Sequence, residues 1–139
     1  MKRLILLTLL SGCNLIEHPD FVTDYNTWVY TNGVSVSAEK INEKQVELLE
    51  CLTTSLQFTR FSVLDSFSAM TINFKEPSME NCGGTTCFGE TDGVDIYIDY
   101  VDNWNQVPLK HMMIHAIYSY TQGGSDFDHE QKNAWACQR

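Results

Sequence analysis

Apolar positions recur at helical spacing through residues 38–56. They fall on one stripe, with most charged residues off it, and the stripe comprises Ile41, Leu48, Leu49, Leu52 and Leu56. Ser37 suits the N-cap, and Glu39 stands in the first turn, where the helix dipole favours a carboxylate. The pattern predicts an amphipathic helix whose apolar face enters the core.

Alternating and β-branched segments predict several short strands. Residues 28–30 are apolar, and Asn32-Gly33 then signals a turn before an alternation of Val and Ser over residues 34–37, which suggests a hairpin. Residues 70–74 alternate cleanly between apolar and polar side chains. Residues 95–101 are the strongest strand prediction, because β-branched and aromatic residues dominate them.

A second helix is expected over about residues 107–121. Pro108 suits its first turn, and Gly123-Gly124 ends it. One face is expected to enter the core, namely Leu109, Met113, Ala116 and Tyr120. Residues 58–67 are mixed and receive no assignment. The order of elements predicts an α+β domain with a small mixed sheet and two main helices.

The N-terminus has the layout of an export signal. Lys2 and Arg3 precede an apolar run from Leu4 to Leu10, which is too short to span a bilayer. The following Leu10-Ser11-Gly12-Cys13 resembles the lipobox of bacterial lipoproteins, a resemblance that implies lipidation of Cys13. We therefore expect a signal peptide at 1–12, a lipidated tether at 13–26 and one domain at 27–139. Asn14 stands in place of Asp, so the resemblance implies sorting to the outer membrane in a host with two membranes.

The chain is strongly acidic. Its net charge is −9, and loss of Lys2 and Arg3 with the signal peptide would make it −11. Such a balance argues against nucleic acid and against an anionic membrane surface as partners. Attachment to the bacterial envelope is expected through the lipid, and a protein or peptide remains the expected ligand. The oligomeric state is not predicted by the sequence.

Four cysteines remain once Cys13 is assigned to the lipid. They are Cys51, Cys82, Cys87 and Cys137, and an even number in an exported chain predicts two disulfides with three possible pairings. The close spacing of Cys82 and Cys87 favours a bridge between them, which leaves Cys51 for Cys137. A cysteine metal site is the alternative, but the spacing lacks the usual CxxC pairs.

Three of the four histidines lie near the C-terminus. His111 and His115 are four residues apart on the predicted helix, so their side chains share a face that also carries Tyr118. His129 follows the Gly-Gly stop with enough chain to return to that face. Three neutral imidazoles suit zinc, and Asp126 and Asp128 are candidates to hold the outer nitrogen of a ligand histidine. The alternative is a pair of histidines without a metal on an amphipathic helix.

The segment resembles the zinc-binding helix of zincin metallopeptidases and, more narrowly, small metalloprotease-like bacterial lipoproteins. There an H-E-x-x-H helix is followed by Gly, by Asp and a third His, and then by an aromatic residue and a Cys. Here the matching residues are His111-Met112-Met113-Ile114-His115, Gly123-Gly124, Asp126, His129, Trp135 and Cys137. The resemblance covers the last third of the chain and implies a zincin-like fold. It also implies that the strand at 95–101 is the edge strand over the metal cleft.

One position departs from that pattern. The catalytic Glu of the zincins follows the first histidine, and this chain has Met112 there. A thioether accepts no proton, so general-base catalysis is lost from this position. The sequence therefore favours an inactive metallopeptidase homologue that serves as a binding or accessory module. The alternatives are a zinc peptidase with Glu130 as a remote candidate base, and a surface lipoprotein without metal.

Acidic residues form a second candidate metal group around residue 95. They are Asp92, Asp95, Asp99 and Asp102. The glycine and glutamate positions of an EF-hand loop are missing. A solvated acidic strand face is the favoured interpretation.

Overall fold

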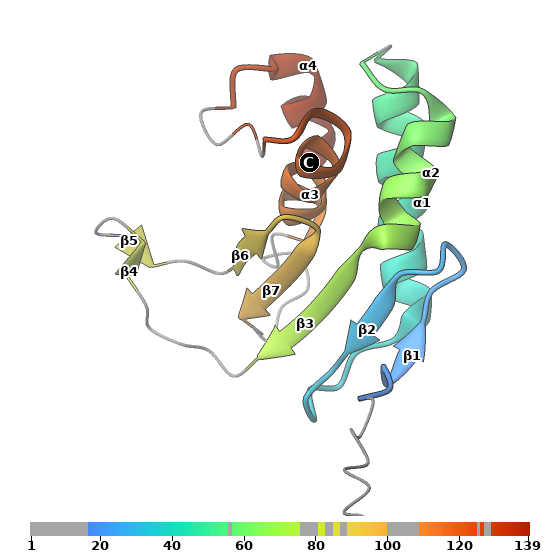
Figure 1. Cartoon of the computed structure of the whole chain (residues 1–139), viewed down its shortest axis with the longest axis vertical. Coiled ribbons are helices and arrows are strands. Elements are labelled where there is room, and N and C mark those ends of the chain that lie inside the picture. The colour runs from blue at the N-terminus through green and yellow to red at the C-terminus, as the bar shows by residue number, and fades with distance from the viewer. Residues whose placement is uncertain are drawn as a thin grey trace, which may run out of the picture.

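A computed structural model describes residues 17–55, 57–75, 81–82, 85–86, 89–99, 109–124, 126 and 129–139. The predicted signal peptide and Cys13 lie outside these residues, as do Cys87, residues 100–108 and Asp128. The described part forms a mixed α/β fold, with three long helices packed on one another and next to a sheet (Figure 1). Within that part, no helix is long and apolar enough to cross a membrane.

The main sheet has five strands in the order β1-β2-β3-β7-β6. They are β1 (Phe21–Val22), β2 (Trp28–Tyr30), β3 (Thr71–Lys75), β6 (Gly89–Asp92) and β7 (Asp95–Asp99). β2, β3 and β7 are parallel, whereas β1 and β6 are antiparallel to their neighbours. The predicted mixed sheet is therefore confirmed. A separate short pair joins β4 (Asn81–Cys82) to β5 (Thr85–Thr86).

Both predicted helices are present. α1 (Ala38–Thr54) begins at Ser37, whose side chain accepts a hydrogen bond from the Lys40 backbone N–H. α3 (Leu109–Gln122) ends at Gly123, whose φ of 72° is a conformation that glycine adopts without a steric penalty. The chain closes with a short helix α4 (Lys132–Trp135) and a 3₁₀ turn at Ala136–Gln138.

Three features of the fold differ from the sequence predictions. A third long helix, α2 (Arg60–Ala69), occupies the unassigned segment, capped by the Thr59 side chain on the Ser62 N–H. Residues 21–22, placed in the tether, form β1 and pair with β2, so the folded domain begins before residue 27. The expected hairpin strand at 34–37 is absent, because that segment leads into α1.

The edge of the sheet also differs from the prediction. The strand beginning at Asp95 lies between β3 and β6, so it is an inner strand. β6 is the edge strand on this side, and it contacts α3. A tight turn at Gly93, with a φ of 63°, joins the two strands. Both β6 and β7 contact α3, and the edge strand of the two is β6, which the sequence pattern did not predict.

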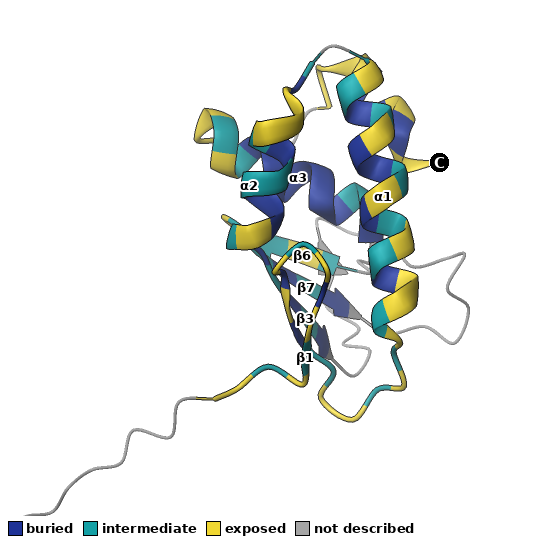
Figure 2. Cartoon of the chain, turned by 90° about the vertical axis from the view of Figure 1, so that its right-hand side faces the viewer, coloured by how far each residue is buried: buried dark blue, intermediate teal, exposed yellow. Residues whose placement is uncertain are grey.

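The core lies between the helices and one face of the sheet (Figure 2). On β3 and β7 alternate side chains are fully buried, namely Ile72, Phe74, Ile96 and Ile98, as the strand period of two requires. The predicted stripe of α1 is confirmed for Ile41, Leu48, Leu49 and Leu52, all buried. On α3, Leu109, Met113 and Ala116 are buried as expected, but Tyr120 is 43% exposed and donates a hydrogen bond to Asp65.

A disulfide joins Cys51 on α1 to Cys137 near the C-terminus. Their Cα atoms lie 5.7 Å apart and their sequence separation is 86 residues. This part of the disulfide prediction is confirmed. The Cys82–Cys87 bridge lies outside what the structure describes and stays a prediction.

Removal of the long bridge is expected to be costly. In the chain-entropy model, closing a loop of this length stabilises the fold by about 4–5 kcal/mol. Denaturant unfolding of the double variant C51A/C137A should show a loss of that order, and C82A/C87A a smaller one, because its loop is short. Equal stability of wild type and C51A/C137A would contradict this account of the tail.

Candidate metal site

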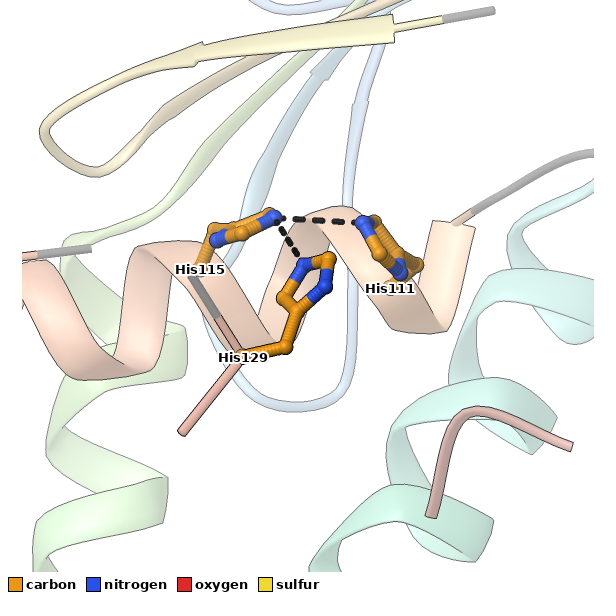
Figure 3. A group of neighbouring side chains, drawn as sticks. All are labelled: His111, His115 and His129. Atoms are coloured by element: carbon orange, nitrogen blue, oxygen red, sulfur yellow. Dashed lines mark hydrogen bonds between the residues drawn. The ribbon is translucent and has the colours of Figure 1, made fainter. Parts of the chain in front are cut away.

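Three histidine side chains converge on one point. His111 and His115 lie one turn apart on α3, and His129 returns from the following loop (Figure 3). The Nε2 atoms of His111 and His115 are 3.1 Å apart, and those of His115 and His129 are 3.4 Å apart. One ligand atom from each residue lies within 4.8 Å of the others. Among the described residues, these histidines could hold a metal ion.

Gln138 determines the tautomer of His111. Its Oε1 lies 2.6 Å from His111 Nδ1. An amide oxygen only accepts hydrogen bonds, so Nδ1 carries the proton and donates it to Gln138. The Nε2 atom of a neutral His111 then directs a lone pair toward the other two histidines. This is the tautomer that a metal ligand needs. No pattern in the sequence predicted the role of Gln138.

Trp135 supports the site from one side. Its ring centroid lies 4.9 Å from that of His111, 4.6 Å from that of His115 and 4.1 Å from that of His129. Trp135 is only 6% exposed, so its indole restricts how the three imidazoles can rotate. The sequence pattern included Trp135 as the aromatic residue of the resemblance, but not as a support for the histidines.

Asp126 organises the loop that delivers His129. Its carboxylate accepts hydrogen bonds from Trp135 Nε1 at 2.7 Å and from the backbone N–H groups of Glu130 and Gln131. The Trp135 bond is the main reason that the pKa of Asp126 lies below its usual value, and His129 lowers it further. Asp126 and His129 both have left-handed backbone, with φ of 48° and 53°. That conformation is uncommon outside glycine and costs about 1 kcal/mol, so these bonds hold a conformation the free chain disfavours.

The substitution Asp126→Asn should loosen this loop. It removes the charge that strengthens the Trp135 bond, and we expect a loss of about 1 kcal/mol in the free energy of unfolding at neutral pH. Folding lowers the pKa of Asp126, so the stabilisation from its carboxylate is fully present above the pKa that Asp126 has in the unfolded chain. This stabilisation is lost as the pH falls through the lower pKa of the folded protein. Wild type and variant should therefore differ in the free energy of unfolding at pH 7, and this difference should shrink as unfolding is repeated at progressively lower pH. Asp24→Asn, at an exposed position, is the control, and an equal effect of both would contradict the role.

Met112 fills the space between α3 and the edge strand. It is 8% exposed, and a Cβ atom placed on Gly89 of β6 would lie 3.0 Å from Met112 Sδ and 3.1 Å from Met112 Cγ. The thioether therefore packs against the backbone of β6, and a side chain at Gly89 would require it to move. Position 112 thus faces the edge strand beside the histidines.

The other predicted site residues are placed as follows. Tyr118 is buried, and its hydroxyl donates a hydrogen bond to Oε1 of Gln57, which follows the C-terminal end of α1. The Tyr118 ring stacks on Trp135. Burial raises the pKa of Tyr118 to about 12, and the charge of Asp126 adds to the effect. Glu130 is exposed, and its backbone N–H donates a hydrogen bond to the Asp126 carboxylate. Asp128 lies outside the described residues.

The geometry fits a small tetrahedral cation. Zinc binds imidazole nitrogen at about 2.0–2.1 Å, which places two such nitrogens about 3.3 Å apart around a tetrahedral ion. The distances of 3.1 Å and 3.4 Å between Nε2 atoms match this spacing for two of the three pairs. His115 is 4% exposed whereas His129 is exposed, so the site is closed toward the core and open on the loop side. Three ligands with one open side leave room for water or a ligand from outside.

Comparison of the chain with protein-family models, with curated proteins and with solved structures found no match. The site itself and the resemblance of its residues are therefore the basis for a proposed function.

Proposed function

We propose that this chain is a lipid-anchored envelope protein with a zincin-like zinc site that has lost peptidase activity. It would act as a binding or accessory module for a protein or peptide. The convergence of three imidazole Nε2 atoms, at 3.1 Å and 3.4 Å, carries the proposal. Neutral imidazoles are good zinc ligands, and the Gln138 bond prepares His111 to be one.

The zincin resemblance gains support from the surroundings of position 112. An edge strand, β6, borders the histidine helix, and the side chain after the first histidine faces it. A zincin keeps its catalytic Glu at that position. Bound zinc would polarise a water or a carbonyl group, but Met112 can neither take nor return a proton. Glu130 is exposed on the loop, which does not favour it as a replacement base.

The test combines metal analysis with an activity assay. The purified protein should contain zinc and should fail to hydrolyse an unstructured protein substrate, with or without a chelator. Zinc-free protein after export would remove the metal proposal. Efficient hydrolysis that a chelator stops would instead make the chain a working peptidase.

Anchoring has its own prediction. Cys13→Ala should abolish incorporation of a labelled fatty acid and leave an unprocessed precursor, because the modified residue of the Leu10-Ser11-Gly12-Cys13 element is gone. Membrane fractionation and mass spectrometry of the N-terminus give the readout. Cys51→Ala is the control, and it should keep the label. Continued lipid attachment in Cys13→Ala would overturn the lipobox assignment.

A further inference from the structure

We propose that the Cys51–Cys137 disulfide is a redox latch for the metal site, so that its reduction releases the metal ion. This inference rests on the proposed function, because it needs a metal held by the three histidines. It deepens that function by naming how retention of the metal is regulated.

The C-terminal strap, residues 129–139, supplies three different parts of the site. His129 provides a candidate ligand, Trp135 supports all three imidazoles, and Gln138 accepts the outer N–H of His111. Only His111 and His115 belong to a long helix. A strap that lifts from α3 would therefore remove one ligand and free the ring of another.

The strap is held by the burial of Ala134, Trp135 and Cys137 in the core and, at its end, by the disulfide. Cys137 directly precedes Gln138, so the covalent bond to Cys51 on α1 positions the amide that contacts His111. Lys110 Nζ also donates a hydrogen bond to the Arg139 carbonyl oxygen at this end. A single hydrogen bond contributes on the order of 1 kcal/mol, which is far less than a long disulfide.

The disulfide borders open space. A cavity of about 820 Å³ between α1 and the strap is lined by Glu50, Cys51, Lys110, Asn133, Cys137 and Arg139. Cys137 is only 4% exposed, whereas Cys51 is half-buried. A reductant therefore reaches Cys51 more easily than Cys137. When it attacks Cys51, the leaving group is Cys137, which lies on the strap.

A small dithiol supplies the chemistry. Its thiolate attacks Cys51 Sγ, the S–S bond breaks, and Cys137 leaves as a thiolate that takes a proton from solvent. The second thiol of the dithiol then displaces Cys51, which also becomes a thiol. The dithiol is oxidised to its own disulfide, and two electrons pass to the protein. The strap keeps its hydrogen bonds and the packing of Trp135, but its end, which carries Gln138, is no longer tied covalently to α1.

Coupling of this kind works in both directions. If reduction weakens metal binding, bound metal must make the disulfide harder to reduce by the same free energy. Loss of an outer partner of a ligand histidine lowers metal affinity by about 10–100-fold in proteins. We expect a change of this size, because Gln138 is the outer partner of His111 and follows Cys137 directly.

The first experiment measures zinc affinity by competition with a chromophoric chelator. The full-length C82A/C87A variant, which keeps Cys51 and Cys137, is compared oxidised and after reduction by a dithiol that is then removed without oxygen. We expect reduction to weaken zinc binding about 10–100-fold or more. C51A/C137A, which has no thiols at these positions to bind zinc, should show the weak affinity before and after the treatment.

The second experiment does not depend on the folding of C51A/C137A. The fraction of Cys51–Cys137 that is reduced at equilibrium is measured over a series of ratios of reduced to oxidised dithiol, in wild type with zinc and after chelation, by thiol labelling and peptide mapping. Zinc should lower the equilibrium constant for reduction about 10-fold or more, and in H111A it should have no effect. Equal zinc affinity in the oxidised and reduced chains, or equal equilibrium constants for reduction, would overturn the latch while leaving the metal site intact. An oxidised wild type that binds no zinc would instead defeat the proposed function.

Discussion

Replacing His111, His115 or His129 with Ala is expected to remove most of the zinc from the purified protein. Each residue contributes one of three nitrogens within 4.8 Å of one another, and two ligands rarely hold zinc against buffer. Bound metal stabilises the folded state by about 4 kcal/mol at a thousandfold excess over Kd. Each variant should therefore melt on the order of 10 °C lower than zinc-loaded wild type. Elemental analysis and thermal unfolding give the two readouts.

The controls separate metal loss from packing damage. His18→Ala changes an exposed histidine remote in sequence from the site, and it should leave zinc content and melting unchanged. After chelation, H129A should melt only slightly below wild type, because His129 is exposed although its ring contacts Trp135. Full zinc occupancy in all three Ala variants would show that the metal lies elsewhere.

Met112→Glu is expected to create zinc-dependent peptidase activity in a chain that has little or none. General acid–base catalysis contributes about 10²–10⁴ in rate, and position 112 follows the first ligand, where the resembled enzymes carry their base. Met112 packs on Gly89 in a nearly closed space, so an ionised Glu there has to turn toward the metal-bound water or remain buried at a cost. We therefore also expect the variant to be less stable than wild type without zinc. Hydrolysis of an unstructured protein and thermal unfolding measure both effects.

Met112→Gln is the matched control, because it has the size of Glu without a group that takes the proton. Both variants should keep zinc, as should Met112→Ala, since Met112 is not among the three ligands. Activity in M112E that is absent from M112Q and lost with chelator supports the account. Equal activity in wild type, M112Q and M112E would contradict the role assigned to this position.

The sequence predicted those helices and strands whose apolar positions along the chain coincide with the positions that are buried in the fold. α1 has an apolar stripe with a Ser cap, and β3 and β7 alternate as half-buried strands do. α2 was missed because its apolar residues do not follow one face: Phe61 is 77% exposed, while Phe58 before the helix is buried. β6 has the polar sequence Gly-Glu-Thr-Asp, typical of an edge strand, and the Asp92-Gly93 turn that follows was its clearest signal.

The site was predictable as far as spacing determines it. Helical geometry alone places His111 and His115 together, and the Gly123 stop lets the chain return with His129. The parts that spacing cannot predict are the contacts from the strap. Gln138 reaches His111 because the Cys51–Cys137 bridge docks the strap, and Trp135 lies under all three rings because Asp126 binds its indole. Spacing also did not predict that the Tyr118 hydroxyl donates a hydrogen bond to Gln57 while the Tyr118 ring stacks on Trp135.

The zinc content of exported wild-type protein, purified without added metal and measured by elemental analysis, tests the central claim most directly. The account predicts one zinc ion per chain, lost when His111, His115 and His129 are all replaced by Ala and kept when His18 is replaced. Protein that is folded and oxidised at Cys51–Cys137 but contains no zinc, and that takes up none on addition, would contradict it.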